Sequence, residues 1–188
     1  MLRKVAFMVL MACCTGAHAE DAAGSLTVTT YDVHGATADA IADDMARSGP
    51  LDHGHRVDGY TRWRIQTSYA WRFDPRECRL TRFDATLGIA MTLPQWVPTG
   101  HPSASLRRRW ERFSAALRTH EDGHAAIGRD ARQQILDRAR ALGPESDCKA
   151  LVQRVDDLVA DVMKSHRQMD VDYDARTNHG ETQGAVFP

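Results

Sequence analysis

One short segment of the sequence places metal-binding and acid–base side chains at a fixed helical spacing. This segment is His120-Glu121-Asp122-Gly123-His124, which fits the pattern His-Glu-x-x-His. Residues four apart on a helix lie one turn apart on the same face, so both imidazoles are able to bind one Zn²⁺ ion. Glu121 lies about 100° around the helix from His120, where its carboxylate is placed to take a proton from water that zinc activates. The motif therefore predicts zinc-dependent hydrolysis of a peptide bond, with Glu121 as the general base.

The apolar residues around the motif predict that its two histidines face the protein core. Apolar side chains recur at helical spacing on both sides of the motif, at Leu106, Trp110, Phe113, Leu117, Ile127, Ala131 and Ile135. His120 and His124 continue this stripe at positions where Leu or Phe would otherwise be expected. The alternative interpretation is a pair of core histidines, each satisfied by a neighbouring polar group, with Glu121 in solvent.

A catalytic zinc ion needs a third protein ligand and an open coordination position. A histidine close behind the motif is not available, because Ile127 and Asp130 stand three and six residues after His124. A second predicted helix offers three carboxylates and one histidine, namely Asp156, Asp157, Asp161 and His166. The C-terminal segment offers Tyr173, Asp174 and His179. The spacing of these residues leaves the choice open.

The elements that must position the motif follow from the hydrophobic periodicity. Alternating apolar and polar residues predict three strands, at 26–33, 63–73 and 83–93. The turn at Asp74-Pro75 is short, so the second and third strands are expected to pair antiparallel.

Helical spacing predicts three helices, at 38–48, from a cap at Ser103 or Ser105 to Gly143-Pro144, and at 147–169. Residues 170–188 are expected to form a polar tail. Strands that come early and helices that come late predict an α+β fold, in which an N-terminal antiparallel sheet packs against the long helix that carries the motif and a second, C-terminal helix.

Composition narrows the class of protein. The chain has 188 residues, of which 43% are hydrophobic and 26% are charged, as in an ordinary globular domain. The formal net charge of −1 supplies no basic field for a phosphate backbone, so no nucleic-acid partner is expected.

The N-terminus has the pattern of an export signal. Arg3 and Lys4 precede an apolar run, and Ala17-His18-Ala19 fits a cleavage site, with cleavage after Ala19. Residues 1–19 are therefore predicted to be a signal peptide, and residues 20–188 a single secreted or periplasmic domain without a transmembrane segment. An alternative is a lipoprotein signal, which would leave a lipidated Cys13.

Two cysteines, Cys78 and Cys148, follow the predicted signal. An even pair in an exported protein predicts a disulfide, which would close a loop of about 70 residues and stabilise the fold by about 4 kcal/mol. The alternative, that both cysteines bind metal, lacks the close Cys-x-x-Cys spacing.

Several motifs together resemble a known family. They are HEDGH at 120–124, YDARTNHG at 173–180 and QGAVFP at 183–188, with shorter upstream matches around Tyr31, Gly49-Pro50, Tyr60, Trp63, Cys78, Leu93-Pro94, Trp96 and Trp110. The sequence resembles the bacterial domain of unknown function 922, whose members are predicted to be secreted zinc-dependent proteases. The resemblance covers nearly the whole chain that follows the predicted signal. It implies a zincin-like fold and a zinc cofactor.

The resemblance also guides the choice of the third ligand. In such folds the segment after the helix pair often returns to the metal, which favours His179 as the third ligand. Asp174 is the alternative, by analogy with zincins that use aspartate. Tyr173 is a candidate donor to the developing oxyanion on chemical grounds. The alternative for Tyr173 and Asp174 is a structural turn, in which the ring is buried and the carboxylate caps the backbone.

The expected function is that of an exported zinc metallopeptidase acting on a peptide or protein substrate. Two alternatives have the same motif. One is a non-catalytic periplasmic module that a metal ion stabilises, and the other is a zinc amidase acting on cell-wall peptides.

Overall fold

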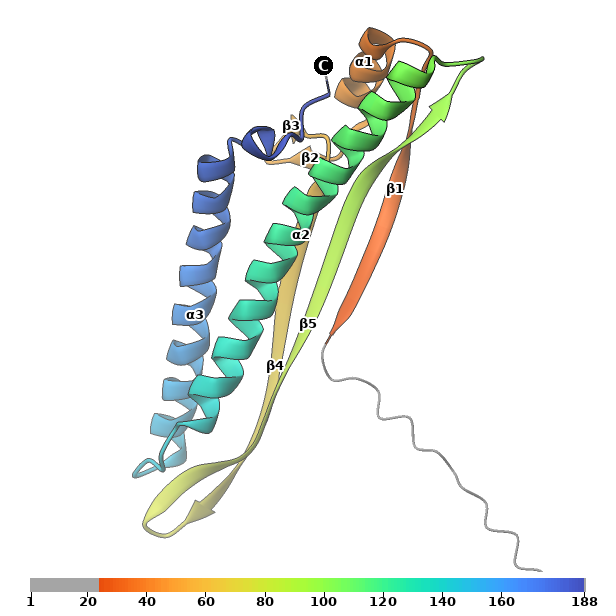
Figure 1. The fold of residues 1–188 in the computed structure, drawn as a ribbon. Coiled ribbons are helices and arrows are strands. Elements are labelled where there is room, and N and C mark those ends of the chain that lie inside the picture. Colours follow the sequence, from red (N-terminus) through yellow and green to blue (C-terminus); the bar gives the residue numbers. More distant parts are fainter. Residues whose placement is uncertain (1–23, 188) are drawn as a thin grey trace, which may run out of the picture.

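The structure is a computed structural model that describes residues 24–187. The predicted signal peptide, its cleavage site after Ala19 and the alternative lipid site at Cys13 lie outside the described residues. The described residues form an α+β fold with a mixed three-stranded sheet and a second, two-stranded one (Figure 1). Figure 1 shows the helix α2 (Ala104–Arg140) lying along the larger sheet and the helix α3 (Cys148–Thr177) beside α2.

The strands β4 (Tyr60–Asp74) and β5 (Glu77–Pro98) form the predicted antiparallel hairpin. Alternation along β5 turns Leu87, Ile89 and Met91 toward α2, where all three side chains are buried with Ala125. These apolar contacts hold the middle of α2, and with it the His-Glu-x-x-His motif, against the sheet.

The expectation of an all-antiparallel sheet is wrong for the first strand. The strand β1 (Ser25–Gly35) runs parallel to β5, with Ser25 opposite Gly88 and Gly35 opposite Pro98. The helix α1 (Ala38–Ser48) and a small hairpin of β2 (Leu51–Asp52) and β3 (His55–Arg56) reverse the chain before β4. Because β4 then runs opposite to β1, its hairpin partner β5 returns parallel to β1. In the sheet, β5 lies between β1 and β4.

The helix α2 begins where the sequence predicted, and of the two candidate caps Ser103 is the one used. Its hydroxyl oxygen accepts a hydrogen bond from the Leu106 amide at 3.2 Å. The helix continues without a break through His120 and His124 to Arg140.

The helix α3 is longer than predicted, and this changes the setting of two candidate residues. It ends at Thr177 and not at 169, so Tyr173 and Asp174 belong to a helix and not to a polar tail. No glycine or proline interrupts residues 170–177, and the helix stops only at Asn178, which adopts a left-handed conformation with φ of 48°. A short 3₁₀ turn, η1 (Glu181–Gln183), follows.

The predicted disulfide between Cys78 and Cys148 is present and joins the start of β5 to the start of α3. It lies at the end of the helix pair where α2 passes into α3, while the motif lies nearer the C-terminal end of α3. Among the described residues no helix combines the length and apolar character needed to cross a membrane.

Candidate metal centre

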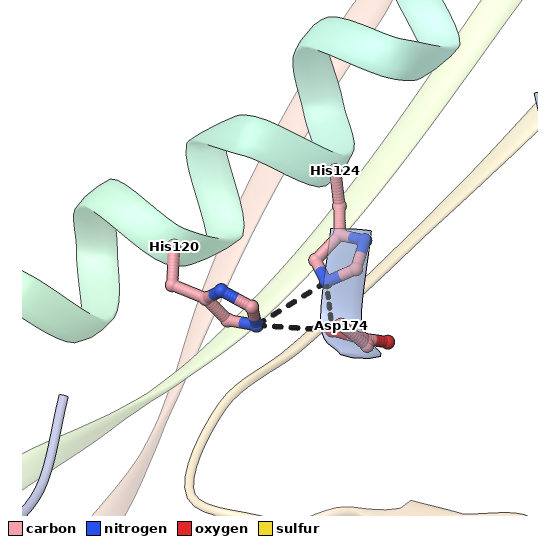
Figure 2. Close-up of side chains that lie close together, drawn as sticks. All are labelled: His120, His124 and Asp174. Carbon is pink, nitrogen blue, oxygen red and sulfur yellow. Dashed lines mark hydrogen bonds and ion pairs between the residues drawn. The ribbon is translucent and has the colours of Figure 1, made fainter. Parts of the chain in front are cut away.

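Three side chains from α2 and α3 converge on one point between the two helices (Figure 2). The Nε2 atoms of His120 and His124 lie 3.3 Å apart. The Oδ1 atom of Asp174 lies 3.3 Å from His120 Nε2 and 3.0 Å from His124 Nε2. The two imidazoles are largely buried, whereas the Asp174 side chain is 30% exposed. The structure thus brings together the two motif histidines and the aspartate that was the alternative third ligand.

The other ring nitrogens define how the two imidazoles are oriented. His124 Nδ1 donates to Asp170 Oδ1 at 3.0 Å, and His120 Nδ1 donates to Gln183 Oε1 at 3.0 Å. With the hydrogen on Nδ1 of both rings, the lone pair of each Nε2 points toward Asp174. Two lone pairs and a carboxylate oxygen facing one another require a cation between them, either a proton or a metal ion.

The spacing of these three atoms fits a metal ion. Donors 2.0–2.1 Å from a tetrahedral zinc ion lie about 3.3 Å from one another. The measured separations of 3.0, 3.3 and 3.3 Å agree with that value. Imidazole nitrogen and carboxylate oxygen are also the donor types that zinc accepts. The residues of this site therefore fit the zinc ion that the motif predicts.

The glycine of the motif allows α3 to approach α2 at the site. A Cβ atom on Gly123 would lie 2.2 Å from the hydroxyl of Tyr173, far inside contact distance. The Tyr173 ring stacks on His120 with centroids 5.1 Å apart, and its hydroxyl donates to the His120 carbonyl at 3.2 Å. Close approach at Gly123 thus places Tyr173 against His120, one residue before Asp174.

Burial, hydrogen bonds and nearby charges together shift the pKa values of His124 and Asp174 strongly. Burial by itself would lower the pKa of His124, but hydrogen bonds to Asp170 and Asp174 outweigh burial and raise it to about 10. Burial would raise the pKa of Asp174, yet hydrogen bonds and the charges of the two histidines hold it well below its usual range. Without metal, the site therefore retains a proton on an imidazole beside an ionised carboxylate.

Glu121 lies on the side of α2 that faces the sheet. Its side chain is only 3% exposed and sits against Gly59 and Thr61 at the start of β4. Among the described residues its Oε2 atom has no hydrogen-bond partner. Burial raises the pKa of Glu121, and the Thr61 hydroxyl and the charges of His124 and His120 lower it only in part. A buried carboxylate with a free oxygen beside a cation site is suited to accept a proton.

His179, the first choice for the third ligand, lies at the edge of the cluster. Its side chain is 79% exposed, and its Nδ1 atom is 4.0 Å from Asp174 Oδ1. Asn178, His179 and Gly180 all have positive φ angles, and Gly180 packs against the His120 ring. This left-handed turn holds His179 near Asp174, and its role as a ligand stays a prediction.

The remaining candidates from α3 lie elsewhere. His166 is buried, with its Nε2 3.0 Å from Asp130 and its Nδ1 donating to the Val162 carbonyl at 2.9 Å. Asp161 lies 3.8 Å from Arg138. Among the described residues, none of these belongs to the group of side chains that could hold a metal ion.

Two residues around the site were not singled out from the sequence as part of it. Asp170 contacts His124 and also accepts a hydrogen bond from the Trp63 indole at 2.7 Å. Gln183 contacts His120 from the 3₁₀ turn and hydrogen-bonds to Tyr173. The sequence signal for Asp170 is its spacing of four residues from Asp174, which places both on one face of a helix. That signal has meaning only once α3 is known to continue past residue 169.

Comparison with known proteins identifies the family of this chain. Residues 28–180 match the family model described as "Bacterial protein of unknown function (DUF922)". The match covers most of the chain, including the motif and Asp174, and the protein belongs to this family. Neither a curated protein nor a solved structure matches it.

Proposed function

We propose that this protein is an exported zinc metallopeptidase of zincin-like type. One observation carries the proposal: His120, His124 and Asp174 hold three donor atoms at 3.0–3.3 Å from one another. These are the separations expected around one tetrahedral ion. The three donors lie next to Glu121, a buried carboxylate with an unpartnered oxygen.

In this proposal His120, His124 and Asp174 hold the zinc ion. Bound there, zinc would supply Lewis-acid activation of water and of a substrate carbonyl at neutral pH. His179, the third ligand predicted from the sequence, is the proposed alternative to Asp174 in that position, because its Nδ1 atom lies 4.0 Å from Asp174 Oδ1 on a mostly exposed side chain. Only one of the two is proposed to bind the ion at a time, which leaves a coordination position open for water.

The acid–base work falls to Glu121 and Tyr173. Glu121 Oε2 would take a proton from the attacking water and pass it to the leaving amine nitrogen. Tyr173 is the proposed donor to the developing oxyanion, and it would exchange its hydrogen bond to the His120 carbonyl for one to the substrate.

The proposed location rests on the N-terminal pattern and on the disulfide. Residues 1–19 are proposed to be a signal peptide and residues 20–188 the mature domain. The disulfide between Cys78 and Cys148 supports a secreted or periplasmic location, since disulfides persist in oxidising compartments.

The test combines metal content with hydrolysis of labelled casein and of purified cell-wall sacculi. Wild-type protein should contain one zinc ion per chain, and His120→Ala and Asp174→Ala should lose it. Glu121→Gln should retain the zinc and lose hydrolysis by about 10²–10⁴-fold. A zinc-loaded wild type that hydrolyses neither substrate would favour the non-catalytic module, in which the ion only joins α2 to α3. Hydrolysis of sacculi alone would favour the cell-wall amidase.

A further inference from the structure

We propose that Asp170 is a positioning residue that sets the metal affinity of His124, and that the Trp63 indole holds Asp170 in place. The inference rests on the proposed zinc site and adds the residues that orient it. Three elements take part, because Trp63 comes from β4, His124 from α2 and Asp170 from α3.

The contacts form a chain from the sheet to the ligand atom. The Trp63 Nε1–H group donates to Asp170 Oδ2 at 2.7 Å, and Asp170 Oδ1 accepts from His124 Nδ1 at 3.0 Å. Each carboxylate oxygen of Asp170 therefore has one partner, and the two partners lie on different elements. The His124 ring is thereby held with Nε2 toward Asp174.

Trp63 is itself held firmly. Its ring lies over Gly128 of α2, where a Cβ atom would be only 2.7 Å from Trp63 Cγ. No side chain at position 128 separates the indole from the helix, so the Nε1–H group is presented to α3 at a fixed position. The anchor for Asp170 is thus part of the packing of β4 against α2.

The two histidines differ in the group that accepts a hydrogen bond from Nδ1. His124 donates to a carboxylate that is 27% exposed, whereas His120 donates to the neutral amide oxygen of Gln183. A carboxylate that accepts from Nδ1 makes the opposite nitrogen a stronger donor to a metal, and loss of such a partner commonly weakens metal binding by about 10–100-fold. Asp170 is therefore expected to contribute more to affinity than Gln183.

The experiment measures zinc affinity by competition with a chromophoric chelator, and the visible absorption spectrum of the Co²⁺-loaded protein. Asp170→Asn should bind zinc about 10–100-fold more weakly than wild type and should change the Co²⁺ spectrum. Its melting temperature without metal should be lower than that of wild type, because asparagine has one acceptor oxygen for the two donors, Trp63 Nε1–H and His124 Nδ1–H. The affinities are therefore compared at a temperature at which both proteins are folded.

Asp172→Asn is the matched control. It removes the same charge two residues further along α3, where the side chain is exposed and accepts a hydrogen bond from Gln168. Its zinc affinity and Co²⁺ spectrum should equal those of wild type. Wild-type affinity in folded Asp170→Asn would overturn the assignment, as would an equal loss in both variants.

A second variant decides the matter if Asp170→Asn does not fold. Trp63→Phe removes the indole donor and leaves Asp170 in the chain, and the loss of this one hydrogen bond should weaken zinc binding by about threefold or more. Unchanged affinity in that variant would overturn the assignment. A wild-type protein that binds neither zinc nor Co²⁺ would overturn the proposed metal site itself, which is a separate result from equal affinities in wild type and variant.

Discussion

Replacing Gly123 with alanine would test how closely α2 and α3 pack at the candidate metal centre. An alanine Cβ would lie 2.2 Å from Tyr173 Oη and 2.4 Å from Tyr173 Cζ. Non-bonded heavy atoms prefer about 3.5–4.0 Å, so the ring would have to move by about 1 Å or more. The move is opposed by the stacking of Tyr173 on His120 and by its hydrogen bond to the His120 carbonyl.

The magnitude follows from two opposing effects. Overpacking of this kind costs about 1–3 kcal/mol, whereas alanine stabilises a helix by about 1 kcal/mol relative to glycine. Gly123→Ala should therefore lower the free energy of unfolding by about 0–2 kcal/mol in the wild-type background. With Tyr173→Ala present the clash disappears, and the same substitution should raise that free energy by about 1 kcal/mol.

The assay is urea unfolding of the wild type, the two single variants and the double variant, all in EDTA to remove metal. The coupling free energy between positions 123 and 173 should then be about 1–3 kcal/mol. If Gly123→Ala changes the free energy of unfolding equally in both backgrounds, Tyr173 is not what limits the space at Gly123, and the reasoning fails.

Two further predictions concern the disulfide and pH. Cys78→Ser combined with Cys148→Ser should lower the free energy of urea unfolding by about 4 kcal/mol, because the bond closes a 70-residue separation; a loss below about 1 kcal/mol would contradict this. In metal-free protein, the pKa of His124 is raised from 6.5 to about 10, so its contribution to stability is complete below pH 6.5 and is lost as the pH rises through 10. Urea unfolding between pH 6 and 10 should show this fall in wild type and a flatter profile in His124→Gln, and equal profiles would refute it.

Much of the secondary structure could be predicted because it depends on local periodicity. The β4–β5 hairpin and the course of α2 follow from alternation and from helical spacing over neighbouring residues. The parallel pairing of β1 with β5 could not be predicted in this way, because it joins residues more than 60 positions apart.

The end of α3 was missed for a different reason. Residues 170–177 are mostly polar, and the apolar stripe that marked the helix stops before them, although no residue there breaks a helix.

The sequence by itself determined that His120 and His124 share a helix face beside Glu121, because four residues span about one turn whatever the rest of the chain does. It also indicated Cys78 as the disulfide partner of Cys148, since Cys78 is the other cysteine outside the predicted signal. Tertiary structure alone decided that Asp174 reaches both imidazoles while His179 lies at the edge, and that Trp63 and Asp170 meet 107 positions apart. These contacts depend on how far α3 continues and how closely it packs on Gly123, which are properties of the packed helix pair and not of any one segment.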